Sequence, residues 1–383
     1  MRCIVLGAGR QGLAIAYDLA RHGGATEITL VDSSAKAVRA GAKRLRALAP
    51  DTRIKQHAVA LRGVMDAAKL MRGHDVAVSA LPYRFNPALA KAAVRARTHF
   101  CDLGGNTGLV KEALKLNAAA KKAGVTLVPD CGLAPGLGNV LAAIAIKETH
   151  GVQHVRIRCG GLPLSPAGPL GYSLLFSIEG LTNEYRGEAV IVRDGRVQRF
   201  EAFTEPESIQ GPPGLGTLEC FFTSGGTSTA PWRYSGKLKT YDYKTVRYHG
   251  HFEKVRAMID LGLLDLKPVA VGDSKVVPRD VWHAVAGPRL LQGDGKDCAF
   301  LRVEATDDAG RGVRYEMLQY FDEQTGFTAM EQTTGYPTAA IALAMVRGEL
   351  KPGAYTPDRC GLGAEHIRDL RDRGLQIRRT AIG

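Results

Sequence analysis

The chain of 383 residues is too long for one ordinary hydrophobic core, so its length indicates about two domains. Its 45% hydrophobic and 23% charged residues are typical of a globular protein. The net charge of +13 would fit nucleic-acid binding, but the basic residues are spread along helical stretches such as 36–48 and 367–379 without interleaved aromatic residues. We therefore expect solvated helix faces and no nucleic-acid partner.

Membrane insertion and secretion are not expected either. No apolar stretch approaches the roughly 20 residues of a membrane-spanning helix. The N-terminal apolar run breaks at Gly7, too early for a signal peptide, so we expect a cytoplasmic protein. Seven scattered cysteines without a CxxC pair argue against a disulfide framework and a structural zinc site, and we expect no metal.

The first elements predict a dinucleotide site. An apolar run at 3–6 reads as a short buried strand, and 10–23 reads as an amphipathic helix. Between them the glycines of GxGxxG allow a tight turn, close approach of the backbone to a pyrophosphate, and close packing of helix on strand. The residues expected to bind the cofactor here are Gly7, Gly9, Arg10, Gln11 and Gly12.

A second strand, expected over 27–32, ends in Asp32, twenty residues after the last glycine of the loop. A carboxylate at this place accepts hydrogen bonds from the adenosine ribose and repels a 2′-phosphate, which favours NAD. Lys36 and Arg39 follow closely and leave NADP open.

Three further apolar runs, at 75–82, 98–105 and 125–132, alternate with helical patterns. Such alternation predicts an α/β fold with a doubly wound parallel Rossmann sheet, in which ligands bind at the carboxyl ends of the strands. The strand ends place these residues near the cofactor or substrate: Ser79, Ala80, Leu81, Pro82, Asp102, Gly104 and Asp130.

The second half has a different pattern. After a helix expected over 132–151, half-alternating strand runs lie at 154–163, 189–200, 243–251, 298–307 and 313–322, which predicts an α+β domain with a mixed or antiparallel sheet. A final helix is expected over 335–350. The expected domains are a dinucleotide-binding domain at 1–131, a catalytic domain at 132–334, and a C-terminal return at 335–383 that packs on the first domain.

Several motifs together resemble the saccharopine dehydrogenase-like superfamily, nearest to the lysine 6-dehydrogenases: VLGAGRQGLAIAYDLA, VPDCGLAPGLGNVLA, FSIEGLTNEY and YKTVRYHGHFEKV. The resemblance implies a Rossmann domain, a mixed-sheet catalytic domain and a returning C-terminal helix. It also implies oxidation of a C–N bond with a nicotinamide cofactor and without metal. In the lysine-specific members the ε-amino group leaves as ammonia, and the semialdehyde then cyclises to a piperideine carboxylate.

This chemistry needs a base for the substrate ammonium and an acid or base for water addition. Our candidates are Asp130, Glu179 and His251, although Asp130 could cap a helix, Glu179 could pair with an arginine and His251 could only end a strand. Arg247 is the candidate for the substrate carboxylate. Strand alternation places Lys244 on the opposite face from Arg247.

Residues 223–229, TSGGTST, are either an anion-binding turn or a flexible loop. Cys131 is not expected to be a nucleophile, because no histidine accompanies it locally.

The leading function is therefore NAD(P)-dependent oxidative deamination of L-lysine at the ε-amino group, in a protein that forms a homo-oligomer and binds a small amino-acid substrate. A saccharopine-type or carboxyspermidine-type dehydrogenase or reductase is the alternative within enzymes. It would need more arginines, for which Arg84, Arg158 and Arg186 are candidates. A non-catalytic dinucleotide sensor is the alternative of another class.

Overall fold

The structure is a computed structural model that describes residues 1–166, 168–291 and 293–383, and it has two compact units. Unit 1 consists of Met1–His150, Thr227–Arg233 and Glu331–Ile377, and unit 2 consists of Gly151–Gly226, Tyr234–Met330 and Arg378–Gly383. The boundaries expected at 131 and 334 therefore do not describe the division. The short segment Thr227–Arg233 belongs to unit 1, although the residues on both sides of it belong to unit 2. The C-terminal residues Arg378–Gly383 belong to unit 2, although the residues before them belong to unit 1.

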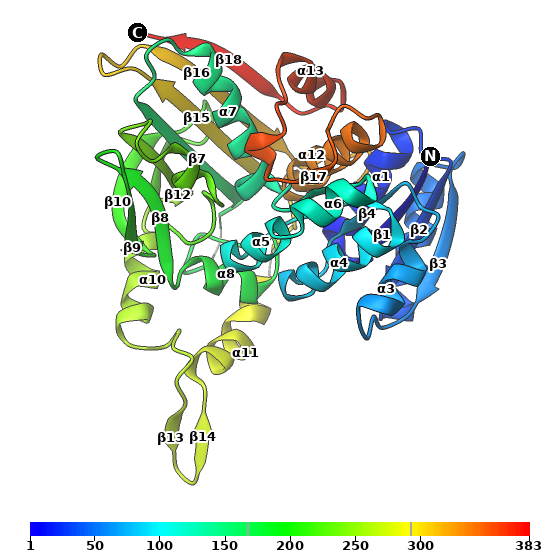
Figure 1. Cartoon of the computed structure of the whole chain (residues 1–383). Coiled ribbons are helices and arrows are strands. Elements are labelled where there is room, and N and C mark those ends of the chain that lie inside the picture. Colours follow the sequence, from blue (N-terminus) through cyan, green and yellow to red (C-terminus); the bar gives the residue numbers. More distant parts are fainter. Residues whose placement is uncertain (167, 292) are drawn as a thin grey trace. The chain divides into compact units, whose positions relative to one another are not determined.

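Unit 1 contains a parallel sheet in the strand order β17-β6-β5-β4-β1-β2-β3, with helices packed on it (Figure 1). The central strand β1 has Cys3, Ile4 and Val5 fully buried, as expected of a strand covered on both faces. The predicted Rossmann fold is confirmed. The strands are β1 (Arg2–Leu6), β2 (Glu27–Asp32), β3 (Arg53–Ala58), β4 (Val76–Ser79), β5 (His99–Asp102), β6 (Thr126–Val128) and β17 (Gly353–Ala354).

The helices of unit 1 carry many small residues on their buried faces. In α4, for example, Ala90, Ala92 and Ala93 are fully buried in the core against Phe100. The helices are α1 (Arg10–Arg21), α2 (Ala35–Leu48), α3 (Val64–Met71), α4 (Asn86–Ala96), α5 (Thr107–Leu114), α6 (Asn117–Ala123), α7 (Gly138–Glu148), α9 (Ala230–Tyr234), α12 (Ala329–Val346) and α13 (Ala364–Asp372), with short turns η1 (Tyr83–Phe85), η2 (Leu133–Leu137) and η3 (Pro357–Arg359).

Two sequence expectations for these helices need correction. The helix expected over 132–151 begins only at Gly138, because Ala134, Pro135 and Gly136 have non-helical backbone angles. The helix expected over 335–350 is α12, which begins earlier and ends at Val346. None of the helices that the structure describes combines the length and the apolar character required to cross a membrane.

The C-terminal part of unit 1 is tied to its N-terminal part by a buried ion pair. Arg373, directly after α13, donates from Nη1 to Asp18 of α1 at 2.9 Å, and both side chains are almost completely buried. β17 adds a further link, because it extends the sheet beside β6. Residues more than 300 positions apart thus form one core.

Unit 2 contains a mixed sheet in the order β10-β11-β12-β7-β15-β16-β18, with β8 and β9 attached at β12. β12 and β7 are parallel, whereas β7 and β15, and β11 and β12, are antiparallel. The strand run expected over 189–200 is the β8–β9 hairpin, in which Arg193 pairs with Arg196 across the turn. The strands are β7 (His154–Pro163), β8 (Glu188–Arg193), β9 (Arg196–Glu201), β10 (Thr204–Gln210), β11 (Thr217–Phe222), β12 (Thr240–Tyr248), β15 (Asp297–Thr306), β16 (Gly312–Tyr320) and β18 (Ile377–Ile382), and the helices are α8 (Ile178–Glu184), α10 (His251–Asp260) and α11 (Pro278–Leu290).

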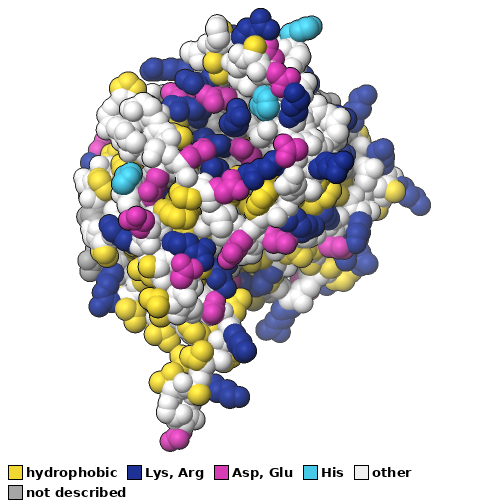
Figure 2. All heavy atoms as spheres, turned by 90° about the vertical axis from the view of Figure 1, so that its left-hand side faces the viewer, with side chains coloured by type: hydrophobic (Ala, Val, Ile, Leu, Met, Phe, Trp, Pro, Cys, Tyr) yellow, Lys and Arg dark blue, Asp and Glu magenta, His cyan; other side chains and the backbone are white. Residues whose placement is uncertain are grey.

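A separate hairpin of β13 (Val269–Val271) and β14 (Ser274–Val276) projects next to α11 (Figure 1). Val269 and Val271 are 48% and 59% exposed. Figure 2 shows hydrophobic side chains gathered around this projection, while acidic and basic side chains are interspersed over the rest of that face.

Candidate active site

The glycine loop after β1 has the geometry of a dinucleotide-binding turn. Gly7 has φ +110°, and a Cβ there would lie 2.8 Å from the Ala80 carbonyl oxygen. A Cβ on Gly12 would lie 1.9 Å from the Gly7 oxygen, so helix and strand pack too closely for a side chain. A Cβ on Gly9, in contrast, would meet nothing within 4 Å. Open space lies where a pyrophosphate would approach, and the residues fit the group.

The first turn of α1 starts at Arg10 and has no side-chain cap, so its backbone N–H groups are available to phosphate oxygens. The Arg10 side chain donates from Nε to Glu331 at 2.8 Å, which gives it a structural partner in α12. Gln11 follows it in the same turn.

Asp32 fixes the shape of the glycine loop. Its two carboxylate oxygens accept backbone N–H groups of Ala8 and Ser34 at 2.9 and 2.8 Å. A carboxylate has about four acceptor sites, so the ribose hydroxyls retain acceptors there. Lys36 is exposed on the adjoining helix α2, and so is Arg39.

The segment after β4 supports the loop from the other side. Ser79 is fully buried and donates its hydroxyl to Asn86 at 2.9 Å, so that hydroxyl is engaged within the protein. Ala80 contacts the glycine loop through its backbone, whereas Leu81 and Pro82 are partly or fully exposed. Of the four predicted positions, only Ser79 is buried, and Ala80, Leu81 and Pro82 have surface available for a ligand.

Two buried carboxylates lie at the ends of β5 and β6. Asp102 accepts N–H groups of Gly104 at 2.8 Å and of Asp130 at 3.2 Å, and burial raises its pKa to about 6. Asp130 is 1% exposed and has φ +63°. Gly104 is required here, because a Cβ at that position would lie 1.7 Å from Asp130 Oδ1.

Asp130 differs from Asp102 in how it is partnered. Its Oδ2 accepts a hydrogen bond from Ser228, and its Oδ1 is buried without a hydrogen-bond partner among the described residues. Burial raises the pKa of Asp130 to about 7, the Ser228 hydroxyl opposes this rise, and the charge of Asp102 adds to it. The group can therefore gain or lose a proton near neutral pH.

Ser228 is the residue that the sequence did not identify. It is 3% exposed, has φ +51°, and lies in the segment that returns to unit 1. The neighbouring Thr227 carbonyl accepts from Asn139 at 3.2 Å. The sequence TSGGTST predicts an anion-binding turn or a flexible loop. The structure instead buries most of it, and one of its hydroxyls binds a carboxylate.

Unit 2 has its own buried polar cluster around Arg247. The guanidinium donates from Nε to the Tyr185 hydroxyl at 3.1 Å, lies 3.8 Å from Glu184, and stands 4.7 Å from the Tyr172 ring centre. Burial raises the pKa of Glu184 and Arg247 opposes this, although 35% of the Glu184 side chain is exposed. Arg247 itself is 2% exposed.

Lys244 faces the other side of β12, as predicted. It donates to Glu207 at 3.0 Å, and Arg158 binds the same carboxylate at 2.7 Å. Arg247 and Lys244 therefore belong to different clusters.

His251 does not end a strand, because β12 stops at Tyr248 and Gly250, with φ +87°, turns the chain into α10. Its Nδ1 lies 3.0 Å from the Leu170 carbonyl oxygen, and its Nε2 lies 2.9 Å from the Tyr185 hydroxyl. The carbonyl can only accept, so Nδ1 carries the hydrogen and Nε2 accepts from Tyr185. Burial, reinforced by the Arg247 charge, lowers the pKa of His251 to about 3, so it stays neutral at physiological pH.

Glu179 is exposed in the first turn of α8, which Ser177 caps. Glu184, at the other end of the same helix, is the carboxylate near Arg247. Both glutamates occur in the motif FSIEGLTNEY, but only the contact with Arg247 distinguishes them.

Cys131 is fully buried, donates to the Val128 carbonyl at 3.2 Å, and has its pKa raised by burial, so it remains a thiol. In the parts of the chain with described coordinates, no group of three or more His, Cys, Asp or Glu residues could hold a metal ion.

Comparison with known proteins places this geometry in a family. The family model described as "Saccharopine dehydrogenase NADP binding domain" matches residues 3–128, and "Saccharopine dehydrogenase C-terminal domain" matches 132–375. The NADP-binding domain supports the expected NAD(P) cofactor.

Two curated relatives are saccharopine dehydrogenases [NADP(+), L-glutamate-forming]. The enzyme of Saccharomyces cerevisiae is 28% identical over 389 residues, which cover 82% of this chain and 86% of that protein. The enzyme of Pyricularia oryzae is 28% identical over 209 residues, or 50% of this chain, and the match spans only 44% of that protein. The solved structure of the apo S. cerevisiae enzyme has the same fold, with a TM-score of 0.78 at 20% identity and complete coverage of both chains. The chain belongs to the saccharopine dehydrogenase family.

Proposed function

We propose that the chain is an NAD(P)-dependent oxidoreductase that oxidises the CH–NH group of an amino-acid substrate, with the ε-carbon of L-lysine as the first candidate. The observation that carries the proposal is Asp130. This carboxylate lies at the carboxyl end of the sheet that bears the glycine loop, one of its oxygens is unpartnered, and burial raises its pKa to about 7.

The chemistry follows from what an amine oxidation requires. The dinucleotide, when bound, accepts the hydride from the carbon that bears nitrogen. The nitrogen must first lose a proton so that its lone pair can form the C=N bond, and a lysine ammonium has a pKa of about 10.4 in water. Asp130 in its ionised form takes this proton. Water then adds to the C=NH₂⁺ carbon, the carbinolamine releases ammonia, and the ε-semialdehyde remains.

Within unit 2, Arg247 is proposed to bind a carboxylate group, with Glu184 close enough to attract an ammonium group. Support comes from the cluster itself, because the Tyr172 hydroxyl is buried there without a hydrogen-bond partner in the described coordinates. A carboxylate oxygen would satisfy this hydroxyl.

A count of the arginines favours lysine over saccharopine, which bears three carboxylates. Arg158 is bound to Asp242 at 2.6 Å and to Glu207 at 2.7 Å, and Arg186 is bound to Asp265 at 2.7 Å. Arg84 belongs to unit 1 and stacks on Phe85 at 4.9 Å. Of these three arginines, the two in unit 2, Arg158 and Arg186, are thus bound to other carboxylates and lie outside the Arg247 cluster.

Saccharopine-type chemistry is the second candidate, because the two relatives named above carry that name. Both substrates present a secondary or primary amine at the carbon that loses hydride. The same Asp130 would take the proton in either reaction.

One set of assays separates the candidates. Purified protein is incubated at pH 9 with NAD⁺ or NADP⁺ and either L-lysine or saccharopine, while reduced cofactor, ammonia and glutamate are measured. We expect reduced cofactor and ammonia in equal amounts from lysine. 6-Hydroxynorleucine, with a hydroxyl in place of the ε-amino group, is the matched control and should not react.

Glutamate release from saccharopine without lysine turnover would replace the first candidate by the second. A third outcome is tight dinucleotide binding without any turnover. If no amine is oxidised, and no aldehyde is reduced together with an amino acid, the protein is a sensor and the enzymatic proposal is refuted. Homo-oligomer formation remains a prediction and is checked on the same sample by light scattering.

A further inference from the structure

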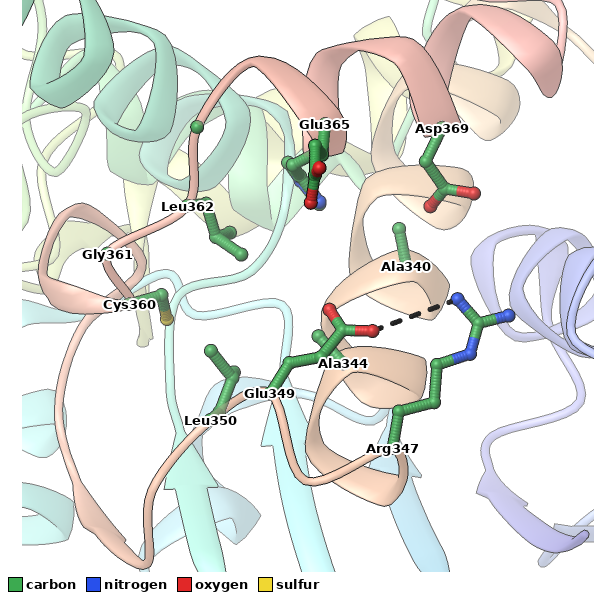
Figure 3. Close-up of a pocket in the computed structure, with 12 residues that line it drawn as sticks. Ala340, Ala344, Arg347, Glu349, Leu350, Cys360, Gly361, Leu362, Glu365 and Asp369 are labelled. Carbon is green, nitrogen blue, oxygen red and sulfur yellow. Dashed lines mark ion pairs between the residues drawn. The ribbon is translucent and has the colours of Figure 1, made fainter.

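Unit 1 contains a cavity of about 390 Å³ that does not use the glycine loop or the Asp130 cluster. Its lining comes from one stretch of chain, residues 340–369, which contributes the last turns of α12, the turn after it, the loop before α13 and the start of α13 (Figure 3). The cavity is therefore formed by the C-terminal segment of unit 1.

Carboxylates dominate the charges around this cavity. Figure 3 shows Glu365 and Asp369 extending from α13 toward the cavity and Glu349 extending from the opposite wall. Arg347 is the one lysine or arginine among the lining residues, and it approaches Glu349 only to 4.0 Å. The formal charge of the lining is thus −2 with histidine neutral, in a chain whose net charge is +13.

Glu349 and Glu365 are weakly engaged within the protein. Glu349 has 53% of its side chain exposed, and Glu365 has 95% exposed and comes no closer than 4.0 Å to Arg368. Asp369 differs, since Arg373 donates to it from Nη2 at 3.0 Å. Two of the three carboxylates therefore remain open to a cationic ligand at the mouth of the cavity.

His366 supplies an independent sign of a missing partner. It lines the cavity, it is 8% exposed, and its Nε2 is buried with no hydrogen-bond partner in the described part of the chain. Burial lowers the pKa of His366 to about 4, so the ring is neutral at physiological pH and one of its nitrogens accepts a hydrogen bond. An unpaired polar atom at such a depth is costly, and a donor from a ligand would remove this cost.

The remaining walls indicate the shape of the ligand. Leu350, Ala340 and Ala344 are almost fully buried, and Leu362 is half-buried, so the cavity has an apolar lining beside its charges. The acidic residues here are not among any metal-binding group found in the described coordinates. Separated carboxylates and an apolar surface suit an organic cation with methylene groups better than a metal ion.

We propose that this cavity is a binding site for a small aliphatic amine. The ammonium groups are bound by Glu349 and Glu365, the methylene groups contact the alanine and leucine side chains, and His366 accepts a hydrogen bond from an ammonium N–H. The site is separate from the proposed reaction and does not depend on it.

The test measures binding of 1,5-diaminopentane to the full chain by isothermal titration calorimetry at pH 7.5. 1,5-Pentanediol, which has the same length and no charge, is the matched ligand control. The variant Glu349→Gln/Glu365→Gln removes both open carboxylates. Asp372→Asn is the matched protein control, because this exposed residue lies on α13 but does not line the cavity.

We expect 1,5-diaminopentane to bind the wild type saturably, to bind the double variant at least tenfold more weakly, and to bind Asp372→Asn as it binds the wild type. We expect no binding of 1,5-pentanediol to the wild type. Binding that persists in the double variant would place the amine elsewhere, for example at the substrate site, and would overturn the proposal. If Asp372→Asn weakens amine binding as much as the double variant does, the effect is a general electrostatic one and the proposed site is refuted. The absence of any amine binding to the wild type would also refute the proposal. Unchanged turnover in the double variant, when activity is established, verifies that the fold is intact.

Discussion

Each unit buries a cluster of titratable side chains, and the two clusters differ in how completely their members are partnered. Around Arg247 in unit 2, the guanidinium, Tyr185 and His251 form a chain of hydrogen bonds between 2.9 and 3.1 Å. Around Asp130 in unit 1, one carboxylate oxygen binds Ser228 and the other is unpartnered in the described structure.

We propose that this difference separates a positioning role from a proton-transfer role. His251 has its pKa lowered to about 3, so nothing in the physiological range changes its charge. Asp130 has its pKa raised to about 7, so small changes in its surroundings change its protonation. Burial is the largest cause of both shifts: it disfavours the charged form, so it raises the pKa of the carboxyl group toward neutral pH and lowers the pKa of the imidazole away from it.

The largest loss of stability is expected for Arg247→Met. This change removes a buried cation and leaves Tyr185 and Glu184 without it, and we expect a loss of about 3 kcal/mol in the free energy of unfolding, measured by urea denaturation. Arg199→Met is the control, because Arg199 is 56% exposed in its pair with Glu188 and should change stability by less than about 1 kcal/mol. If Arg247→Met lowers the free energy of unfolding by less than about 1 kcal/mol, the buried cluster around Arg247 does not contribute to the stability of the fold.

Asp130→Asn should lower kcat by about 10²–10⁴-fold, the usual contribution of a general base. Dinucleotide binding, followed by fluorescence, should remain. Because the folded pKa of Asp130 is raised, its contribution to stability is present below about pH 4 and is lost as the pH rises through about 7. The wild type should therefore lose stability relative to the variant over this window. Full activity in Asp130→Asn would contradict the assignment.

Ser228→Ala should have a smaller and more specific effect. The Ser228 hydroxyl lowers the pKa of Asp130, so its removal should raise that pKa and move the acidic limb of the kcat/KM profile to higher pH by about one unit. Ser228→Cys keeps a weak S–H donor without β-branching at this left-handed position and should restore part of the shift. An equal loss of activity at every pH would indicate a structural role instead.

The smallest effect is expected for Glu179→Gln. This exposed side chain should change kcat by less than about twofold and stability by less than about 0.5 kcal/mol. Steady-state kinetics at pH 7 and pH 9 provide the measurement. A loss of kcat comparable to that of Asp130→Asn would show that Glu179 acts as a base in the reaction.

The sequence predicted the dinucleotide half well because its signals are local. The GxGxxG turn, the buried strands and Asp102 all follow from spacing along the chain. The alternation of β12 also separated Arg247 from Lys244 correctly, since strand periodicity is a short-range property.

The rest depends on contacts between distant residues. Ser228 reaches Asp130 across 98 positions, and no pattern in TSGGTST indicates that partner. Glu184 and Glu179 occur in one motif and are chemically the same, so only the tertiary contact with Arg247 distinguishes them. The strand expected over 243–251 includes His251, whereas β12 stops at Tyr248 and Gly250 turns the chain into a helix.

The composition of unit 1 from three chain segments has a practical consequence for protein engineering. A gene fragment ending at His150 would lack the sheet-edge strand β17, the buried partner of Asp18, and the hydroxyl that binds Asp130. Chimeras that exchange the cofactor domain with a relative should therefore transplant Thr227–Arg233 and Glu331–Ile377 together with the first segment. A single fusion point after the N-terminal segment would produce an incomplete core.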